Sequence, residues 1–172
     1  MKLFFTIMFF SIFAQAELLD EVFSDYCSPE YYDCSQASQN IVKNYFAAGA
    51  PVASLDETLY AGSCYMVSSS YNKDHEHFGY LYFRQREGKL DFFGAFSYFF
   101  EENPYLNMTI AEARALNPDN SQYQVLESAE HWRVDTNIDP PWQYFMRESN
   151  SKLYVIGFWG IDDSITCELT KK

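Results

Sequence analysis

Two histidines and two carboxylates stand side by side in the segment Asp74–His77. In an extended backbone alternate residues share a face, so His75 and His77 would point the same way. Imidazole nitrogens bind divalent metals, and a nearby carboxylate would complete such a site. The competing interpretation is a polar hairpin loop that begins at 71–73 and faces water. Two histidines without a clear third ligand favour the loop, and His75 and His77 remain the candidate metal ligands.

Aromatic side chains are the second chemical resource, since the chain has 14 Tyr, 16 Phe and 3 Trp. The run from Phe92 to Phe100 places aromatic rings on both faces of one predicted strand, and both faces therefore need partners. The structural interpretation is a sheet covered by helices. The functional interpretation is an apolar or carbohydrate-stacking pocket, because tyrosine has a flat apolar body and one polar tip. The predicted ligand-binding side chains are Tyr65, Tyr80, Tyr82 and Tyr98.

Motifs of catalysis are missing from the sequence. There is no G-x-S-x-G elbow for a nucleophilic serine and no glycine-rich phosphate loop. Adjacent carboxylates such as Glu101-Glu102 would point to opposite faces of a strand and would not converge on one substrate atom. A distant acid/base pair, for example Glu127 with Asp135, stays open and keeps a secreted hydrolase as the enzymatic alternative. No catalytic residue and no cofactor is predicted.

The chain is strongly acidic, with 24 Asp and Glu against 12 Lys and Arg and a formal net charge of -12. Such a surface repels phosphate backbones and anionic lipid head groups. The sequence also contains no basic patch interleaved with aromatic residues. A nucleic-acid partner is therefore not expected.

The N-terminus has the pattern of a signal peptide over residues 1–16. Lys2 precedes an apolar run from Leu3 to Phe13, and the small-x-small site 14–16 comes directly before Glu17. The run is too short for a bilayer, which needs roughly 20 residues. We therefore expect a secreted or periplasmic product with no membrane span after cleavage. Residues 17–172 have the usual size of a single domain.

Four cysteines follow the predicted cleavage site, at Cys27, Cys34, Cys64 and Cys167. An even number in an exported chain indicates two disulfides, for which three connectivities exist. We favour Cys27 with Cys34, which are close in sequence, and Cys64 with Cys167, which lie at opposite ends of the β region. Zinc binding by these thiols is disfavoured because no C-x-x-C pair or suitably spaced histidine accompanies them.

Hydrophobic periodicity divides the chain into a helical cap over 17–50 and a β region over 59–170. The cap contains two helical patterns, joined by the local cysteine pair. The first covers 18–27. The second begins after an N-cap at Ser35 or Asp33, carries Ile41, Val42, Tyr45 and Phe46 on one face, and stops at Gly49 and Pro51. A capping box at Thr109-Ile110-Ala111-Glu112 predicts one further helix, to Leu116. Eight strands are predicted in the β region. They are Leu59–Ser68, Phe78–Arg86, Leu90–Phe100, Tyr123–Glu127, His131–Thr136, Gln143–Glu148, Lys152–Trp159 and Ser164–Thr170.

These patterns predict an α+β fold in which N-terminal, disulfide-stapled helices pack on an antiparallel meander of about seven or eight strands. In the last strand Cys167 shares one face with Ile165 and Leu169, so it points inward toward Cys64. The polar residues Ser164, Thr166, Glu168 and Thr170 alternate with them and are expected on the outer face. A bridge between the first and last strands favours a barrel-like or strongly curled sheet. The leading functional hypothesis is a non-enzymatic exported domain that binds a small ligand, a glycan or an envelope partner through its aromatic-rich sheet. The hydrolase and a divalent-metal module built on Asp74–His77 are the alternatives.

Overall fold

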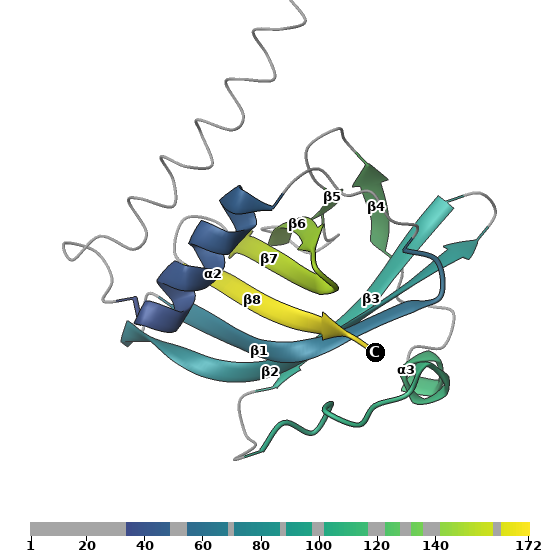
Figure 1. Ribbon diagram of the computed structural model, residues 1–172, viewed down its shortest axis with the longest axis horizontal. Coiled ribbons are helices and arrows are strands. Elements are labelled where there is room, and N and C mark those ends of the chain that lie inside the picture. Colours follow the sequence, from purple (N-terminus) through teal and green to yellow (C-terminus); the bar gives the residue numbers. More distant parts are fainter. Residues whose placement is uncertain are drawn as a thin grey trace, which may run out of the picture.

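The structure of the chain is a computed structural model. It describes residues 34–48, 55–68, 71–86, 89–97, 102–116, 123–127, 132–135, 142–159 and 163–172. Within these ranges, eight strands form one antiparallel sheet, and two helices lie against its outer surface (Figure 1). The strands are β1 (Thr58–Ser68), β2 (Tyr71–Arg86), β3 (Lys89–Ser97), β4 (Tyr123–Glu127), β5 (Trp132–Asp135), β6 (Trp142–Ser149), β7 (Lys152–Trp159) and β8 (Asp163–Lys171).

Each strand pairs with its neighbour in the sequence, and β1 also pairs with β8, so the sheet curls round into a closed barrel. The predicted antiparallel meander and its strong curl are confirmed. The ladders are uneven around the ring. The pairing of β1 with β2 extends from Thr58 to Ser68, whereas β3 and β4 share only the pairs Asp91↔Gln124 and Phe92↔Tyr123. The barrel is therefore firmly built around β1, β2, β7 and β8 and thinly joined at β4.

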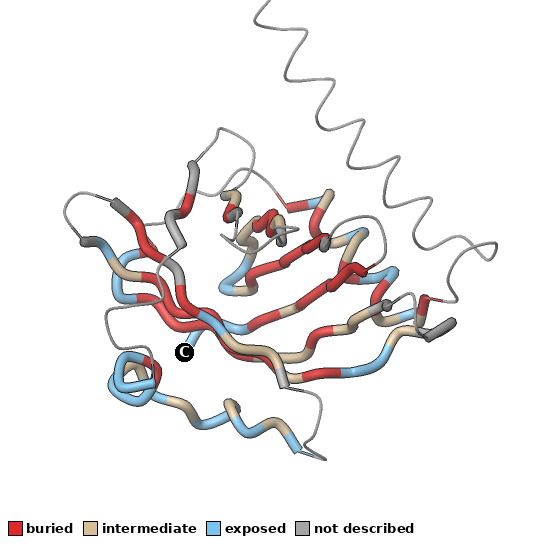
Figure 2. The backbone as a smooth tube through the Cα atoms, turned by 180° about the vertical axis from the view of Figure 1, so that it is seen from behind, coloured by how far each residue is buried: buried red, intermediate tan, exposed pale blue. Residues whose placement is uncertain are grey.

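Strand alternation places one set of side chains inside the barrel, where it forms a continuous apolar core. Buried members of this interior are Leu55, Tyr60, Cys64, Leu81, Phe83, Leu90, Val125, Val134, Tyr144, Met146, Leu153, Val155, Ile165, Cys167 and Leu169, with Met66 and Phe96 packed against them. Figure 2 shows the buried stretches following one another along neighbouring strands. The interior is occupied by side chains from every strand, as expected for a barrel of about eight strands.

Glycines allow this interior to be so tightly filled. A Cβ atom at Gly79 would lie 2.5 Å from Cδ1 of Phe96 and 3.2 Å from Sγ of Cys64. A Cβ atom at Gly157 would lie 2.7 Å from both Ile165 and Tyr144. Real Cβ atoms do not approach this closely, so large neighbours use the space left by the absent methyl groups.

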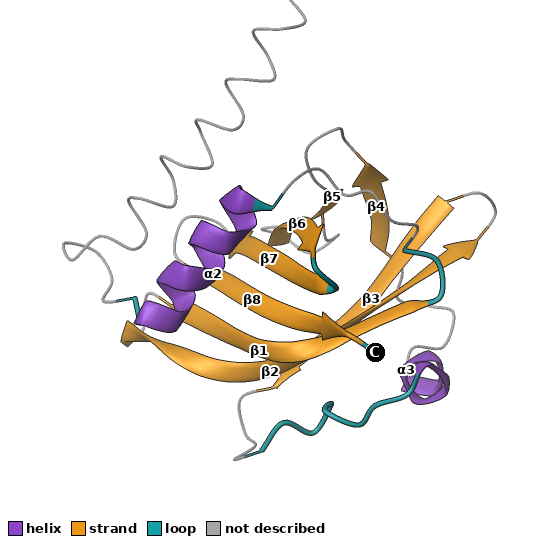
Figure 3. Ribbon diagram, in the orientation of Figure 1, coloured by secondary structure: helices purple, strands orange, loops and turns teal. Residues whose placement is uncertain are grey.

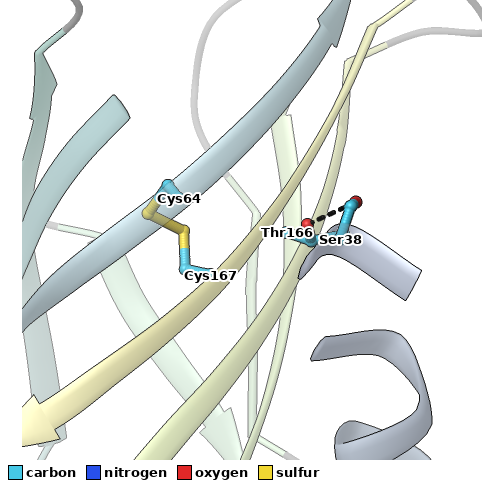
Figure 4. The surroundings of a disulfide bond; sticks show 4 residues. All are labelled: Ser38, Cys64, Thr166 and Cys167. Atoms are coloured by element: carbon cyan, nitrogen blue, oxygen red, sulfur yellow. Dashed lines mark hydrogen bonds between the residues drawn. A yellow bond between two sulfur atoms is a disulfide. The ribbon is translucent and has the colours of Figure 1, made fainter. Parts of the chain in front are cut away.

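The predicted disulfide between Cys64 and Cys167 is present, and it closes a sequence separation of 103 residues. The two cysteines are directly paired positions of β1 and β8. Figure 4 shows the bridge on one side of β8 and, on the other side, Ser38 of the covering helix bonded to Thr166. The bridge therefore locks the first strand to the last from inside the barrel.

Helix α2 (Gln36–Ala47) covers the outer face of β7 and β8 (Figure 3). Ser35 is its N-cap and accepts a hydrogen bond from the backbone N–H of Ser38. Its buried face carries Ile41 and Tyr45, as the sequence predicted. They join a second apolar cluster with Ala48, Phe145, Tyr154, Ile156 and Phe158.

Helix α3 (Ile110–Leu116) lies on another part of the outer surface, against β1 and β2. The predicted capping box is present, since Glu112 Oε2 accepts from the backbone N–H and the hydroxyl of Thr109, at 2.8 Å each. A third apolar cluster forms beneath this helix and its preceding segment; it contains Leu59, Ala61, Tyr80, Tyr82, Phe93 and Ala113. Neither of the helices that the structure describes has the length and apolar character to cross a membrane.

The second predicted strand is longer than the sequence indicated. β2 begins at Tyr71, not at Phe78, so Asp74–His77 belongs to a strand and the predicted polar loop is wrong. The reason is the long partner: Met66, Tyr65 and Cys64 of β1 pair with residues 75–77, and cross-strand pairing outweighs the low β propensity of a charged stretch. The predicted helix at 18–27, and Cys27 with it, lie outside the described residues. None of the described cysteines is a free thiol.

Candidate functional site

The Asp74–His77 segment is split between the two faces of the sheet. Asp74 points to the outer face, where its carboxylate accepts from the backbone N–H of Ser35 at 3.0 Å and from its hydroxyl at 2.7 Å. Glu76 shares that face and raises the pKa of the Tyr65 hydroxyl. His75 and His77 alternate with them and take the inward face. The carboxylates that the metal hypothesis required from this segment are therefore on the wrong side of the strand.

His77 is buried, and it pairs across the ladder with Cys64, whereas His75 is exposed at the end of the barrel. Burial lowers the pKa of His77, and the neighbouring His75 lowers it further. The two imidazoles thus lie close to one another, as the spacing predicted. Across the described ranges, no three side chains drawn from His, Cys, Asp and Glu gather in a way that could hold a metal ion.

The predicted tyrosines do not converge on one pocket. Tyr80 and Tyr82 are buried beneath the segment that leads into α3, where the ring of Tyr80 lies 5.0 Å from that of Tyr105. The hydroxyl of Tyr82 donates to Glu57 at 2.9 Å, and Arg114 of α3 forms an ion pair with the same carboxylate. Burial raises the pKa of Tyr82. These two residues hold the 102–116 segment on the barrel, and Tyr98 lies outside the described residues.

Tyr65 belongs to a different region, a cleft between α2 and the outer face of β1 and β8. The cleft has a volume of about 400 Å³. Its lining combines one aromatic ring with amide, hydroxyl and carboxylate groups. The lining residues are Ala37, Asn40, Ile41, Gly62, Ser63, Tyr65, Glu168 and Thr170.

The electrostatics of this cleft are set by carboxylates. Burial raises the pKa of the Tyr65 hydroxyl, and Glu76, Asp74 and Glu168 raise it further because each disfavours a second negative charge nearby. Tyr65 therefore remains a neutral hydroxyl that can both donate and accept hydrogen bonds. Glu168 forms an ion pair with Lys152 of β7, which holds its carboxylate at the cleft wall.

The cleft is formed because α2 is fixed to the sheet by polar contacts along one line. At the N-terminal end Ser35 bonds to Asp74, and one turn later the Ser38 and Thr166 hydroxyls are 2.9 Å apart. At the C-terminal end Arg147 lies over the ring of Tyr45, 4.8 Å from its centroid. The flank of the helix that carries Asn40 is left standing above the sheet.

A second depression, of about 450 Å³, lies on the 102–116 segment. It is lined by Pro104, Asn107, Met108, Glu112, Ala115 and Leu116. Its one carboxylate, Glu112, is already bonded to Thr109, and hydrogen bonding from Thr109 lowers the pKa of Glu112. The depression offers fewer polar partners than the cleft beside α2.

The pair suggested for acid/base chemistry finds no support in the strand register. Glu127 pairs with Trp132 at one end of β5, whereas Asp135 pairs with Gln143 at the other. In the barrel interior, Tyr60 faces Glu148; burial raises the pKa of Tyr60, and Glu148 raises it further.

No family model, no curated protein and no solved structure matches this chain. The site must therefore be interpreted from its own chemistry.

Of the predicted ligand-binding tyrosines that the structure describes, Tyr65 alone lines the cleft. Alternation in the last strand correctly placed Glu168 and Thr170 on the outer face. What the sequence did not reveal is that Ser63 pairs with Glu168, because that pairing joins residues at opposite ends of the β region. The position of Asn40 also depends on how α2 lies across the sheet.

Proposed function

We propose that this chain is an exported, non-enzymatic binding domain that takes a neutral saccharide in the cleft between α2 and the outer face of β1 and β8. The observation that carries the proposal is the cleft itself, where Tyr65 lies among Asn40, Ser63 and Glu168. An aromatic ring supplies a stacking surface for a sugar ring. Amide, hydroxyl and carboxylate groups around it supply directional hydrogen bonds for sugar hydroxyls.

Charge selects among ligands for this cleft. The negative charges of Asp74, Glu76 and Glu168 all raise the pKa of Tyr65, which shows that they lie near its ring. An anionic ligand stacked on this ring would therefore be repelled by like charge. The chain as a whole carries a net charge of -12, which adds to the repulsion. A neutral glycan avoids this cost and uses the carboxylates as hydrogen-bond acceptors.

The packed interior also supports an outer site. Small barrels that carry ligands inside do so in a lumen, whereas the interior of this barrel is filled by Leu81, Phe83, Leu153 and other apolar side chains. We therefore propose the outer cleft, which is lined by Tyr65, as the binding site.

The proposal also includes export of the chain and a disulfide between Cys27 and Cys34. Residues 1–16 have the composition of a cleavable signal peptide, and the Cys64–Cys167 bridge is of the kind that persists in oxidising compartments. We propose that residues 17–172 form a single secreted or periplasmic domain. In it, Cys27 bonds to Cys34 and ties the chain before α2 to the start of that helix.

The test uses the mature chain on an array of neutral oligosaccharides, with the hits measured by isothermal titration. Asn40→Trp would fill the cleft from the helix side and is expected to lower affinity more than tenfold. Lys43→Trp is the matched control, because Lys43 is also exposed on α2 but does not line the cleft. Circular dichroism would verify that both variants are folded.

Binding by the wild type and by Lys43→Trp, together with its loss in Asn40→Trp, would support the proposal. No binding to any neutral oligosaccharide, or equal binding by the two tryptophan variants, would overturn it. Capture of anionic glycans alone would also contradict the proposed role of the carboxylates.

A further inference from the structure

A group of side chains that could coordinate a metal ion lies at one end of the barrel, on the opposite face of the sheet from the cleft. In the β1–β2 ladder, Met66 stands directly opposite His75, and Cys64 stands directly opposite His77. Directly opposed residues of an antiparallel pair have Cβ atoms about 4.5–5.5 Å apart and point to the same side. His75 therefore has Met66 across the ladder and His77 two residues along its own strand.

The ladder is irregular at this point. The register between β1 and β2 shifts between Met66 and Ser68, directly after the pair Met66↔His75. β-Bulges reorient side chains and are over-represented at barrel rims and next to functional sites. The irregularity therefore lies directly beside Met66, His75 and His77.

Burial changes step by step across the three residues. His77 is only 5% exposed, Met66 is partly buried against the core, and His75 is exposed. An ion could reach His75 from solvent and be held against two side chains already fixed by packing.

The donor set is soft and contains no oxygen from this strand. Asp74 is bonded to Ser35 on the other face, and Glu76 acts on Tyr65 there. The sulfur of Cys64 is bonded to Cys167 and is not available as a thiolate. Ca²⁺ and Mg²⁺ prefer oxygen ligands, whereas thioether and imidazole together suit monovalent copper.

We propose that His75, His77 and Met66 form a binding site for Cu⁺ at this end of the barrel. The ion enters and leaves in the same oxidation state, so binding involves no electron transfer. The site does not depend on the saccharide cleft, because the two lie on opposite faces of β1 and share no residue.

The test is a Cu⁺ titration of the disulfide-bonded mature chain under ascorbate, in competition with bicinchoninate. Met66→Leu keeps the apolar volume and removes the sulfur, and it is expected to weaken Cu⁺ binding at least tenfold. Met108→Leu is the matched control, since Met108 lies on the 102–116 segment away from the histidines. His75→Gln removes the exposed ligand without altering the core and is expected to weaken binding similarly.

X-ray absorption at the copper edge provides an independent readout. The expected result is one Cu⁺ per chain with both nitrogen and sulfur neighbours, and loss of the sulfur neighbour in Met66→Leu. The proposal is overturned if the wild type fails to compete with bicinchoninate or if Met66→Leu binds as tightly as Met108→Leu. It is also overturned if the chain binds Zn²⁺ more tightly than Cu⁺, which would indicate a purely nitrogen site.

Discussion

The inner and outer faces of the same sheet have been put to different uses. The inner face of β1 carries Tyr60 and Cys64 in a core without room for a methyl group at Gly79. The outer face of that strand carries Ser63 and Tyr65 beneath a helix that covers it only in part. The interior of the barrel is filled by side chains, whereas the outer face of β1 keeps an open cleft beside α2. The binding sites proposed above therefore lie at the flank of α2 and at the end of the barrel, where the packing is incomplete.

The largest loss of stability is expected from removal of the Cys64–Cys167 disulfide inside the barrel. Replacing both Cys64 and Cys167 by alanine removes a bridge across 103 residues, and on the chain-entropy model this costs about 4–5 kcal/mol of the free energy of unfolding. Urea unfolding monitored by tryptophan fluorescence would measure it. A double variant as stable as the wild type would mean that β1 and β8 are held together without the bridge.

Truncations on the two faces should differ in cost. Leu153→Ala leaves a cavity among fixed interior neighbours and is expected to cost about 3–4 kcal/mol. Ile41→Ala lies under α2, where the helix can settle toward the sheet, and is expected to cost about 2 kcal/mol. Equal costs in matched urea titrations would remove the distinction between a rigid interior and an adjustable cover.

Adding a methyl group tests the tightness of the interior in the other direction. Gly79→Ala would place Cβ against Phe96 and is expected to cost about 1–3 kcal/mol. Gly94→Ala, at an exposed glycine of the neighbouring strand, is the control and should change stability less. If Gly79→Ala proves neutral by thermal unfolding, the interior has space that the packing does not show.

The smallest change in stability is expected at the capping box of Thr109 and Glu112, at the start of α3 on the outer surface of the barrel. Hydrogen bonds from Thr109 lower the pKa of Glu112 in the folded chain, so their contribution is complete above the usual Glu pKa and is lost as pH falls through the lowered value. Thr109→Ala removes the hydroxyl donor but keeps the backbone N–H, so it should return the pKa of Glu112 only part of the way toward its ordinary range and weaken this acid dependence in part. An NMR titration of the Glu112 carboxyl would show an unchanged pKa if the cap were unimportant.

Local patterns predicted local structure well. The alternation around Cys167, the cap at Ser35 and the box at Thr109–Glu112 each depend on a few neighbouring residues, and all three are found. The start of β2 was missed because its charged residues join a strand only through their partners in β1. Residues 17–33 lie outside the described ranges, so the helix expected at 18–27 and its disulfide link to α2 stay predictions.

The site was harder to foresee because it is assembled from long-range register. Tyr65 was selected for its ring, but grouping it with Tyr80 and Tyr82 did not anticipate that two separate elements cover the sheet. Polar alternation identified Glu168 as outward-facing, yet only the pairing of β1 with β8 places it beside Ser63. For the same reason, Met66 could not be associated with His75 before the ladder was known.

Saccharide binding in the outer cleft, as proposed, leaves the filled interior unchanged. A methyl-resolved NMR titration with an oligosaccharide hit from the array tests it directly. We expect the signals of Ile41 and of the neighbouring Ala37 to shift, while those of Leu81, Leu153 and Val155 do not. Shifts concentrated in the three interior residues, with Ile41 unchanged, would contradict it.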